Sequence, residues 1–322
     1  MKPLAQTPTP QTKRQRGAAL LAAMLTVALV ATFAAGALWQ QWRAIEIEGA
    51  ERQRTQARWL LTGALDWARV ILREDARASD ASTPTDHLAE PWAVPLQEAR
   101  LSSFLAALPD GTGNTVDDNT LAQQVLLSGQ ITDAQGRMNV NNLLQGNQLN
   151  SRSVIAFERL FNALDVPITQ LNLLTQGLIA AQRQNNDAPV MPQRVAQLGW
   201  LGLSPQALQV LTPYITLLPA GTPINLNTAS VPVLYASVPN LSLSDAQRLV
   251  QLRERQHWAT VDAFQKALGR PIGIDTSHSV NSRYFEVFGQ LRMPQTILQE
   301  RSLLQREGQE LKVLWRESGS LQ

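Results

Sequence analysis

The residues of this 322-residue chain that indicate chemistry lie at the start of a long apolar run. Lys13, Arg14 and Arg16 precede Gly17, and an uncharged apolar stretch begins at the next residue, Ala18. An ordinary secretory signal is cut after its apolar stretch, at small residues. A basic leader that ends in glycine directly before the apolar stretch is typical of a chain that is cut before that stretch, which then stays on the mature protein. We therefore predict peptidase cleavage between Gly17 and Ala18, which leaves Ala18 as the new N-terminus.

The apolar run from Ala18 to Trp39 is long enough to cross a bilayer as one helix of roughly 20 residues. The charged residues of the leader are all basic, and the first acid in the chain is Glu46. This asymmetry places the N-terminus in the cytoplasm and sends the rest of the chain outward. We predict a single-pass inner-membrane protein with a periplasmic head. Two alternatives stay open: an uncleaved anchor, and a secretory signal cut near Ala35–Ala37.

A helical pattern continues beyond the apolar run. Between Ile45 and Ile71 a stripe of residues recurs at three- and four-residue steps, and charged residues occupy the rest of the circumference. No proline occurs between Gln11 and Thr83, so nothing forces a break. We predict one helix from Ala18 to about Arg77, roughly 90 Å long at 1.5 Å per residue. The stripe comprises Ile45, Gly49, Arg52, Gln56, Trp59, Leu60, Gly63, Ala64, Trp67, Val70 and Ile71.

Composition excludes several classes of function. The chain has no cysteine, so thiol catalysis, zinc ribbons and iron–sulfur clusters are excluded. Its three histidines, His87, His257 and His278, lie far apart in the sequence and in no metal-ligand spacing. Removal of residues 1–17 takes away four of 28 basic residues and leaves 24 against 26 acidic ones, which gives no general attraction to nucleic acid. We predict no enzymatic activity and no cofactor.

The segment after the first helix offers oxygen ligands in a turn-rich stretch between Pro109 and Asp118. The EF-hand spacing fails there, because the sixth position lacks glycine and Leu121 stands where a bidentate glutamate would be. We expect a solvated loop, and calcium stays unassigned. Before this turn we predict a packed loop at 86–95 and a short helix over 97–108. The oxygen-bearing residues of the turn are Asp110, Thr112, Asn114, Asp117 and Asp118.

The remainder of the chain predicts strands on both sides of a helical block. A hairpin is predicted over 130–143 with its turn at 134–136, and further strands over 284–293, 297–307 and 309–315. Between them, seven short helical stretches are separated by proline, glycine and asparagine. The simplest fold is α+β: an antiparallel sheet interrupted by an inserted all-α domain. The helical stretches are 154–164, 171–182, 195–201, 205–211, 231–237, 245–256 and 260–268.

The segment from Ile224 to Arg253 resembles a helix-hairpin-helix. In nucleic-acid-binding forms, hairpin glycines allow backbone N–H groups to approach a phosphate. Here Asn240 and Ser242 stand where two glycines are needed, and residues 221–270 hold only five Lys or Arg against three Asp or Glu. We therefore expect a helical hairpin kept for packing, with Ser230 and Ser244 as candidate N-caps. The alternative function is a membrane-anchored periplasmic DNA-binding protein of the competence kind.

Four features taken together resemble the minor pseudopilin K family of the type II secretion system. They are the junction at Gly17, the stretch Asp86-x-x-x-Glu90-Pro-Trp92, the segment 131–143 and Ile224-Asn-Leu-Asn-Thr-Ala-Ser230. Their order is more specific than any one of them, and the resemblance runs from the leader to about Gly289. One departure is that residues 177–185 lack the Asp-Trp-x-Asp run that family members often carry, which puts any metal contact of that run in doubt.

The resemblance implies a pilin-like architecture, a long N-terminal helix packed on the sheet. Residues 1–17 would be a prepilin-type leader, 18–42 the transmembrane part of the helix, and 43–143 its periplasmic half, a loop region and the first hairpin. Residues 144–280 would be the inserted domain, and 281–322 the remaining strands. Prepilin peptidase would cut at Gly17, and Ala18 would be N-methylated.

The resemblance also implies a structural role at the tip of the pseudopilus, in initiating its assembly for protein export. The partners would be minor pseudopilins I and J and the inner-membrane assembly platform, with no nucleic acid bound. The helix face at Trp59, Trp67 and Ile71 would bind those partners. Pilin-like proteins usually carry Glu at the fifth position after the cut, where it neutralises a neighbour's N-terminal amine. Here that position is Ala22, as in other members of the K family.

Overall fold

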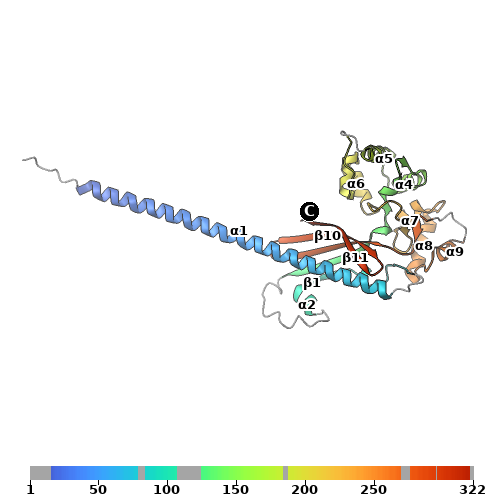
Figure 1. Ribbon diagram of the computed structural model, residues 1–322, viewed down its shortest axis with the longest axis horizontal. Coiled ribbons are helices and arrows are strands. Elements are labelled where there is room, and N and C mark those ends of the chain that lie inside the picture. The colour runs from blue at the N-terminus through green and yellow to red at the C-terminus, as the bar shows by residue number, and fades with distance from the viewer. Residues whose placement is uncertain are drawn as a thin grey trace, which may run out of the picture. The chain divides into compact units, whose positions relative to one another are not determined.

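The computed structural model describes residues 16–78, 84–106, 125–183, 188–269, 276–294 and 296–319 (Figure 1). It divides into two compact units, 1–59 and 60–322. Helix α1 runs from Arg16 to Ala78 and contributes to both units. The first unit contains the apolar stretch from Ala18, which is long and apolar enough to cross a membrane. Its richness in alanine and leucine and its lack of proline account for an unbroken helix.

The second unit contains a five-stranded antiparallel sheet in the order β1-β2-β9-β10-β11. Strand β1 spans Leu96–Arg100 and β2 spans Leu126–Asp133. The last three strands are β9 (Tyr284–Met293), β10 (Thr296–Glu307) and β11 (Glu310–Gly319). The predicted turn at 307–309 joins β10 to β11, and Gly308 adopts a left-handed φ of 61° there. The alternating pattern that predicted these last strands is confirmed.

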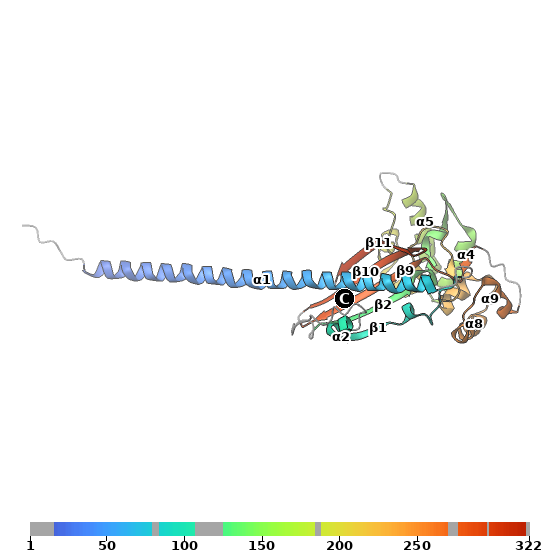
Figure 2. The ribbon, with the colours of Figure 1, turned by 60° about the horizontal axis from the view of Figure 1, so that its bottom comes forward.

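The C-terminal part of α1 packs on one face of this sheet, as Figure 2 shows. Leu65, Ala68 and Leu72 of the helix are buried against apolar residues of β2, β9, β10 and β11. A helix needs such a stripe at three- and four-residue steps to bury one side. The predicted fold, a long N-terminal helix on an antiparallel sheet, is confirmed. The sheet residues in this core are Ile131, Phe285, Val287, Leu304 and Leu311, joined by Trp92.

Between β2 and β9 the chain forms a helical domain with its own core (Figure 1). Three short strand pairs accompany the helices: β3 (Met138–Asn139) with β6 (Ile215–Thr216), β4 (Leu144–Gln145) with β5 (Gln148–Leu149), and β7 (Ile224–Asn225) with β8 (His278–Ser279). All seven predicted helical stretches occur, with ends shifted by up to three residues. They are α4 (Ser151–Ala163), α5 (Ile168–Gln182), η5 (Val195–Leu201), α6 (Pro205–Leu211), α7 (Val231–Ser237), α8 (Leu243–Arg255) and α9 (Val261–Leu268).

The predicted hairpin over 130–143 is wrong. Strand β2 pairs with β1 and β9 and stops at Asp133, whose side chain accepts a hydrogen bond from the Gln135 amide and starts the 3-10 turn η3 (Ala134–Gly136). The chain then leaves the sheet, and Met138 pairs with Ile215 of the helical domain. The asparagines that follow do not end a strand of the sheet, because their amides bind backbone carbonyls of residues 218–222.

Three smaller predictions also need correction. Residues 97–100 belong to β1, because pairing with β2 overrides the local pattern, and the described helix, α2, spans Leu101–Ala106. On α1 the buried side is set by Leu61, Leu65, Ala68 and Leu72, which displaces it from the predicted stripe. The N-cap of α8 is Ser242, whose hydroxyl accepts from the Asp245 amide, and not Ser244. Ser230 is the N-cap of α7 as predicted, without a side-chain bond.

Candidate partner-binding groove

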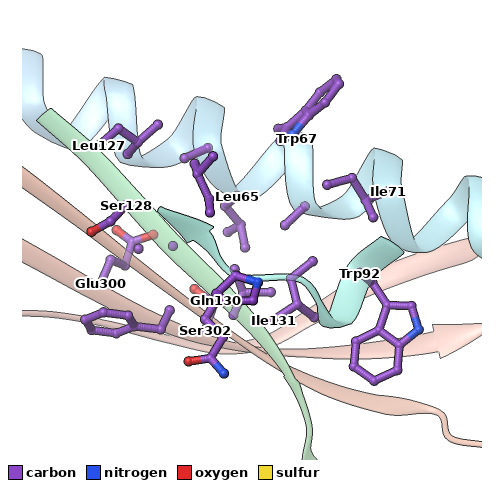
Figure 3. Close-up of a pocket in the computed structure, with 18 of the residues that line it drawn as sticks. Leu65, Trp67, Ile71, Trp92, Leu127, Ser128, Gln130, Ile131, Glu300 and Ser302 are labelled. Carbon is purple, nitrogen blue, oxygen red and sulfur yellow. The ribbon is translucent and has the colours of Figure 1, made fainter. Parts of the chain in front are cut away.

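An apolar groove of about 270 Å³ lies between α1 and the β1–β2 side of the sheet (Figure 3). The helix supplies one wall, the loop at 91–95 with the 3-10 turn η1 (Pro91–Ala93) supplies another, and β2 forms much of the floor. Figure 3 shows Leu65 and Ile71 of α1 on one side and Ile131 of β2 on the other. Val94 at the rim is 69% exposed, so the apolar surface continues out of the groove.

Two glycines make room for this groove. Gly129 of β2 and Gly289 of β9 are cross-strand partners. A Cβ on Gly289 would lie 3.4 Å from Leu61 Cδ2 of α1, and a Cβ on Gly129 would lie 3.1 Å from the Phe288 carbonyl oxygen. Side chains at these two positions would fill the space beneath the helix. The groove therefore depends on glycine at two paired positions of β2 and β9.

Polar groups lie beside this apolar floor. Glu300 is 4% exposed, and its carboxylate binds Arg316 Nε at 2.6 Å and accepts from Ser318 Oγ at 3.1 Å. Ser302 is 1% exposed, and its Oγ has no partner among the described residues. A buried hydroxyl without a partner costs free energy. The floor thus combines apolar surface with the paired carboxylate of Glu300 and the Ser302 hydroxyl, which has no hydrogen-bond partner among the described residues.

Trp92 holds the loop at 91–95, the second wall of the groove, in place. Its ring is 1% exposed and meets Phe285 edge-on, with centroids 5.3 Å apart, and its Nε1 donates to Glu90 Oε2 at 2.6 Å. The backbone N–H of His87 donates to the same oxygen at 3.0 Å. Burial raises the pKa of Glu90 to about 7, although these two hydrogen bonds oppose the shift. The stretch Asp86-x-x-x-Glu90-Pro-Trp92 therefore shapes this wall.

The structure brings together two of the three helix residues predicted to bind partners. Trp67 and Ile71 both line the groove and are half-buried, and Ile71 also packs on the core beneath α1. Trp59 belongs to the other unit and is 72% exposed. The predicted cleavage residues Gly17 and Ala18 lie in the first turns of α1.

A buried polar network joins the sheet to the helical domain. Asp133 at the end of β2 accepts from Gln135 N at 2.7 Å and Ser282 Oγ at 2.6 Å, and it also accepts from Thr228 Oγ1. Asn225 of β7 donates to Asp133 at 3.0 Å. Burial raises the pKa of Asp133, and the hydrogen bonds to its carboxylate oppose that rise. The network fixes the path of the chain where it leaves and re-enters the sheet.

Arg306 of β10 lies beside this network. Its guanidinium binds Asp75 of α1 at 2.9 Å, pairs with Asp86, and donates to the Ser282 carbonyl at 2.9 Å. Oxygens of Asp75, Asp86 and Glu90 lie within 4.8 Å of one another, close enough to suggest a cation site. Arg306 already supplies a positive charge to two of these carboxylates. The calcium ligands considered from sequence, Asp110–Asp118, lie outside the described residues.

Sequence reasoning missed Asn225, Asp133 and Arg306. A signal for the first was present, because Asn225 and Asn227 alternate with Ile224 and Leu226, and all four are buried. Two asparagines inside an apolar run indicate hydrogen bonds within the core. The side chain of Asn227 accepts from Trp258 N at 2.8 Å and donates to the Trp258 carbonyl at 3.0 Å. The contact between Arg306 and Asp86, however, could not be predicted from a local sequence pattern, because the two residues are distant in the sequence.

The hairpin between α7 and α8 contains a left-handed backbone conformation, which glycine favours, but the residue that adopts it is an asparagine. Asn240 adopts a left-handed φ of 56°. Arg159 of α4 donates to the carbonyls of Val238 at 3.1 Å and Leu241 at 2.6 Å, on either side of that residue. A cation at the backbone of this hairpin ties it to α4. The contacts therefore give the hairpin a packing role inside the helical domain.

Comparison with known proteins connects this architecture to one family. The family model described as type II secretion system (T2SS), protein K, matches residues 224–281, which include β7, the hairpin and β8. The type II secretion system protein K of Pseudomonas aeruginosa is 29% identical over 309 residues, covering 87% of this chain and 85% of the relative. That of Pectobacterium carotovorum is 28% identical over 344 residues, covering 95% and 97%. The chain is similar to the protein K family of type II secretion systems over most of its length.

A solved structure shares the fold of this chain. The matched chain comes from the crystal structure of the GspK-GspI-GspJ complex of the enterotoxigenic Escherichia coli type 2 secretion system. The TM-score is 0.61 at 21% identity, and the alignment covers 84% of this chain and 98% of the other. The family resemblance predicted from the sequence is confirmed.

Proposed function

We propose that this chain is a minor pseudopilin of the K family. It binds minor pseudopilins I and J, caps the tip of the pseudopilus and helps to initiate its assembly. The observation that carries the proposal is a helical domain inserted into a pilin-like sheet. Its relatives are named as components of a secretion system, and a chain of the same fold was crystallised with GspI and GspJ. The apolar stretch of α1 would anchor the protein in the inner membrane, with its head in the periplasm.

The inserted domain supports a position at the end of a filament. It occupies most of the chain between Asp133 and Tyr284 and has a core of its own. Stacked pilin-like subunits need narrow heads above and below one another. A head widened in this way would clash with a subunit placed over it, whereas nothing stacks over the last subunit. The assembly platform would then extrude the filament with this subunit leading.

The groove supports partner binding at the side of α1. Trp67, Ile71 and Val94 offer apolar surface, and α1 carries the charged residues Asp66, Arg69 and Arg73 in the same stretch. Apolar contact would supply most of the binding free energy, and the charges around it would set the register. Trp59, which belongs to the other unit, is 72% exposed and is the third helix residue proposed to bind partners.

A co-purification experiment with I and J tests this surface. Val94→Glu places a charge at an exposed rim position, so the fold should persist while the complex is lost. Trp67→Glu should have the same effect if circular dichroism shows a folded head. Trp200→Glu is the matched control, because Trp200 is 58% exposed on the helical domain, away from the groove residues. Unchanged recovery of I and J with a folded Val94→Glu variant would contradict the groove assignment.

A second experiment tests the position in the filament. Gold labels on the helical domain should appear at one end of isolated pseudopili, one cluster per filament. Labels distributed along the length would refute the cap and leave partner binding to be judged by co-purification.

A further inference from the structure

Two tryptophans mark the end of the apolar stretch in the first unit. Trp39 and Trp42 are three residues apart on α1, so their side chains share one side of the helix. Their ring centroids are 5.8 Å apart, with the ring planes at 47°. They are 62% and 56% exposed. Two large adjacent rings on an exposed helix side are apolar surface that water does not favour.

The position of this pair matches the thickness of a bilayer. The 22 residues from Ala18 to Trp39 span about 33 Å at 1.5 Å per residue. The hydrocarbon core is about 30 Å thick, so a helix that starts at Ala18 reaches the headgroup level at Trp39. Gln40 and Gln41 follow, and Arg43 is the first charged residue after the stretch. The sequence therefore changes from apolar to polar at the position of the two tryptophans.

Tryptophan suits this level because its ring is apolar and its indole N–H seeks a hydrogen-bond acceptor. Lipid headgroups and the carbonyls below them offer acceptors beside hydrocarbon. The Arg43 guanidinium, one residue further on, can reach lipid phosphates at the same surface. The rings, the cation and the length of the apolar stretch all point to one occupant for this exposed side, the lipid surface.

We propose that Trp39 and Trp42 bind the periplasmic headgroup layer of the inner membrane and set the depth and tilt of α1. This rests on the proposed membrane topology. Because both rings lie on one side, they anchor the helix asymmetrically and favour one direction of tilt. The anchor fixes how much of α1 stands clear of the membrane for partners. It also adds to the work of withdrawing the subunit from the bilayer.

Quenching of tryptophan fluorescence by brominated phospholipids tests the proposal. The mature full-length chain would be reconstituted into phosphatidylethanolamine–phosphatidylglycerol vesicles with bromines near the headgroup or near the chain ends. The other six of its eight tryptophans follow Trp42, in the part of the chain proposed to stand in the periplasm. The double variant Trp39→Phe and Trp42→Phe should lose at least two-thirds of the quenching. Trp59→Phe, a matched exposed position on the same helix, should keep it.

Shallow bromines should quench the unaltered chain at least twofold more than deep ones. Stronger quenching by deep bromines would place the rings in the hydrocarbon centre and overturn the proposal. Absence of quenching in vesicles that carry the protein on flotation would place the rings in water and overturn it as well. Failure of the unaltered chain to float with the vesicles would instead refute the membrane anchor in the proposed function.

Discussion

Asn225 Nδ2 donates to Asp133 Oδ2 across 3.0 Å and thereby ties the helical domain to the end of a sheet strand. The same amide lies 3.0 Å from the Asp86 carbonyl oxygen and 2.9 Å from Ser282 Oγ, so it faces three acceptors with two hydrogens. Asn225 is fully buried and Asp133 is 3% exposed. Buried networks of this kind are stable only when every member is satisfied. The Asn225 amide therefore links β7 to three other segments of the chain, those of Asp86, Asp133 and Ser282.

Asn225→Asp should destabilise the protein by about 3 kcal/mol, because it removes the donor and places a second carboxylate against Asp133. Urea unfolding followed by circular dichroism measures the loss. Asn172→Asp is the matched control, since Asn172 is exposed near the start of α5 and the change should stay within about 0.5 kcal/mol. Equal stability of the two variants would show that the junction does not need the Asn225 amide.

Two glycines in helices should respond to alanine in opposite directions. A Cβ on Gly177 of α5 would lie 2.7 Å from Leu201 Cβ and 2.9 Å from the Leu201 carbonyl oxygen, so Gly177→Ala should cost about 2–3 kcal/mol. A Cβ on Gly63 of α1 would meet nothing within 4 Å, so Gly63→Ala should stabilise by up to about 1 kcal/mol. Thermal and urea unfolding compare them. A neutral Gly177→Ala variant would mean that η5 shifts away from α5 at little cost.

The helices of the inserted domain were predictable because their burial is periodic and their ends carry local signals. In α4, Phe157, Leu160 and Phe161 lie on the buried side, and the turn after it needs no distant residue to define it. Strands β10 and β11 were predictable for a similar reason, since Gly308 marks a short turn between two runs that pair with each other. In these elements local and tertiary preferences agree.

The errors arose where a distant segment decides the local structure. Ile131 and Met138 alternate as a hairpin would, yet the chain turns away at Asp133 because Asn225, Thr228 and Ser282 all converge on that carboxylate. The groove was only half predicted, since Trp67 and Ile71 were identified but the space depends on a Gly129–Gly289 pairing between β2 and β9. Pairings across more than a hundred residues leave no mark in a local pattern.

The hairpin between α7 and α8 should not bind duplex DNA at physiological salt. Asn240 and Ser242 replace the glycines that allow a phosphate to approach, and Arg159 already occupies the backbone carbonyls beside Asn240. Fluorescence anisotropy with labelled duplex and the full chain in detergent measures this. Micromolar binding with a steep salt dependence would support the DNA-binding alternative.

Gly17→Ala should block processing of the leader. Alanine is at least as good as glycine in a helix, so the change leaves α1 intact and adds only a Cβ at the peptidase's cleavage position. We expect the precursor to accumulate uncut, measured by intact-mass analysis of the membrane fraction, while the unaltered chain starts at an N-methylated Ala18. Processing of the variant at the normal rate would show that the cut does not depend on Gly17.

Glu90 should make the stability of the head depend on pH near neutrality. Burial raises its pKa from 4.5 to about 7 in the folded protein, so the folded state holds a proton that the unfolded state releases. Its contribution to the free energy of unfolding is therefore full below about pH 4.5 and falls as the pH rises to about 7. His87 acts in the opposite sense, because burial and then His257 lower its pKa, and its contribution is lost as the pH falls.

Glu90→Gln separates these effects, because His87 is present in both proteins. At pH 4 a protonated Glu90 and a glutamine have the same shape and charge, so the two proteins should unfold at similar urea concentrations. At pH 8 the variant should be more stable by about 1–2 kcal/mol, since it keeps an acceptor for the Trp92 indole without a desolvated charge. A difference that does not change between pH 4 and pH 8 would mean that Glu90 titrates at its ordinary pKa. A variant that loses stability only at pH 8 would mean that the ionised carboxylate, through His87 and Trp92, stabilises the wall of the groove.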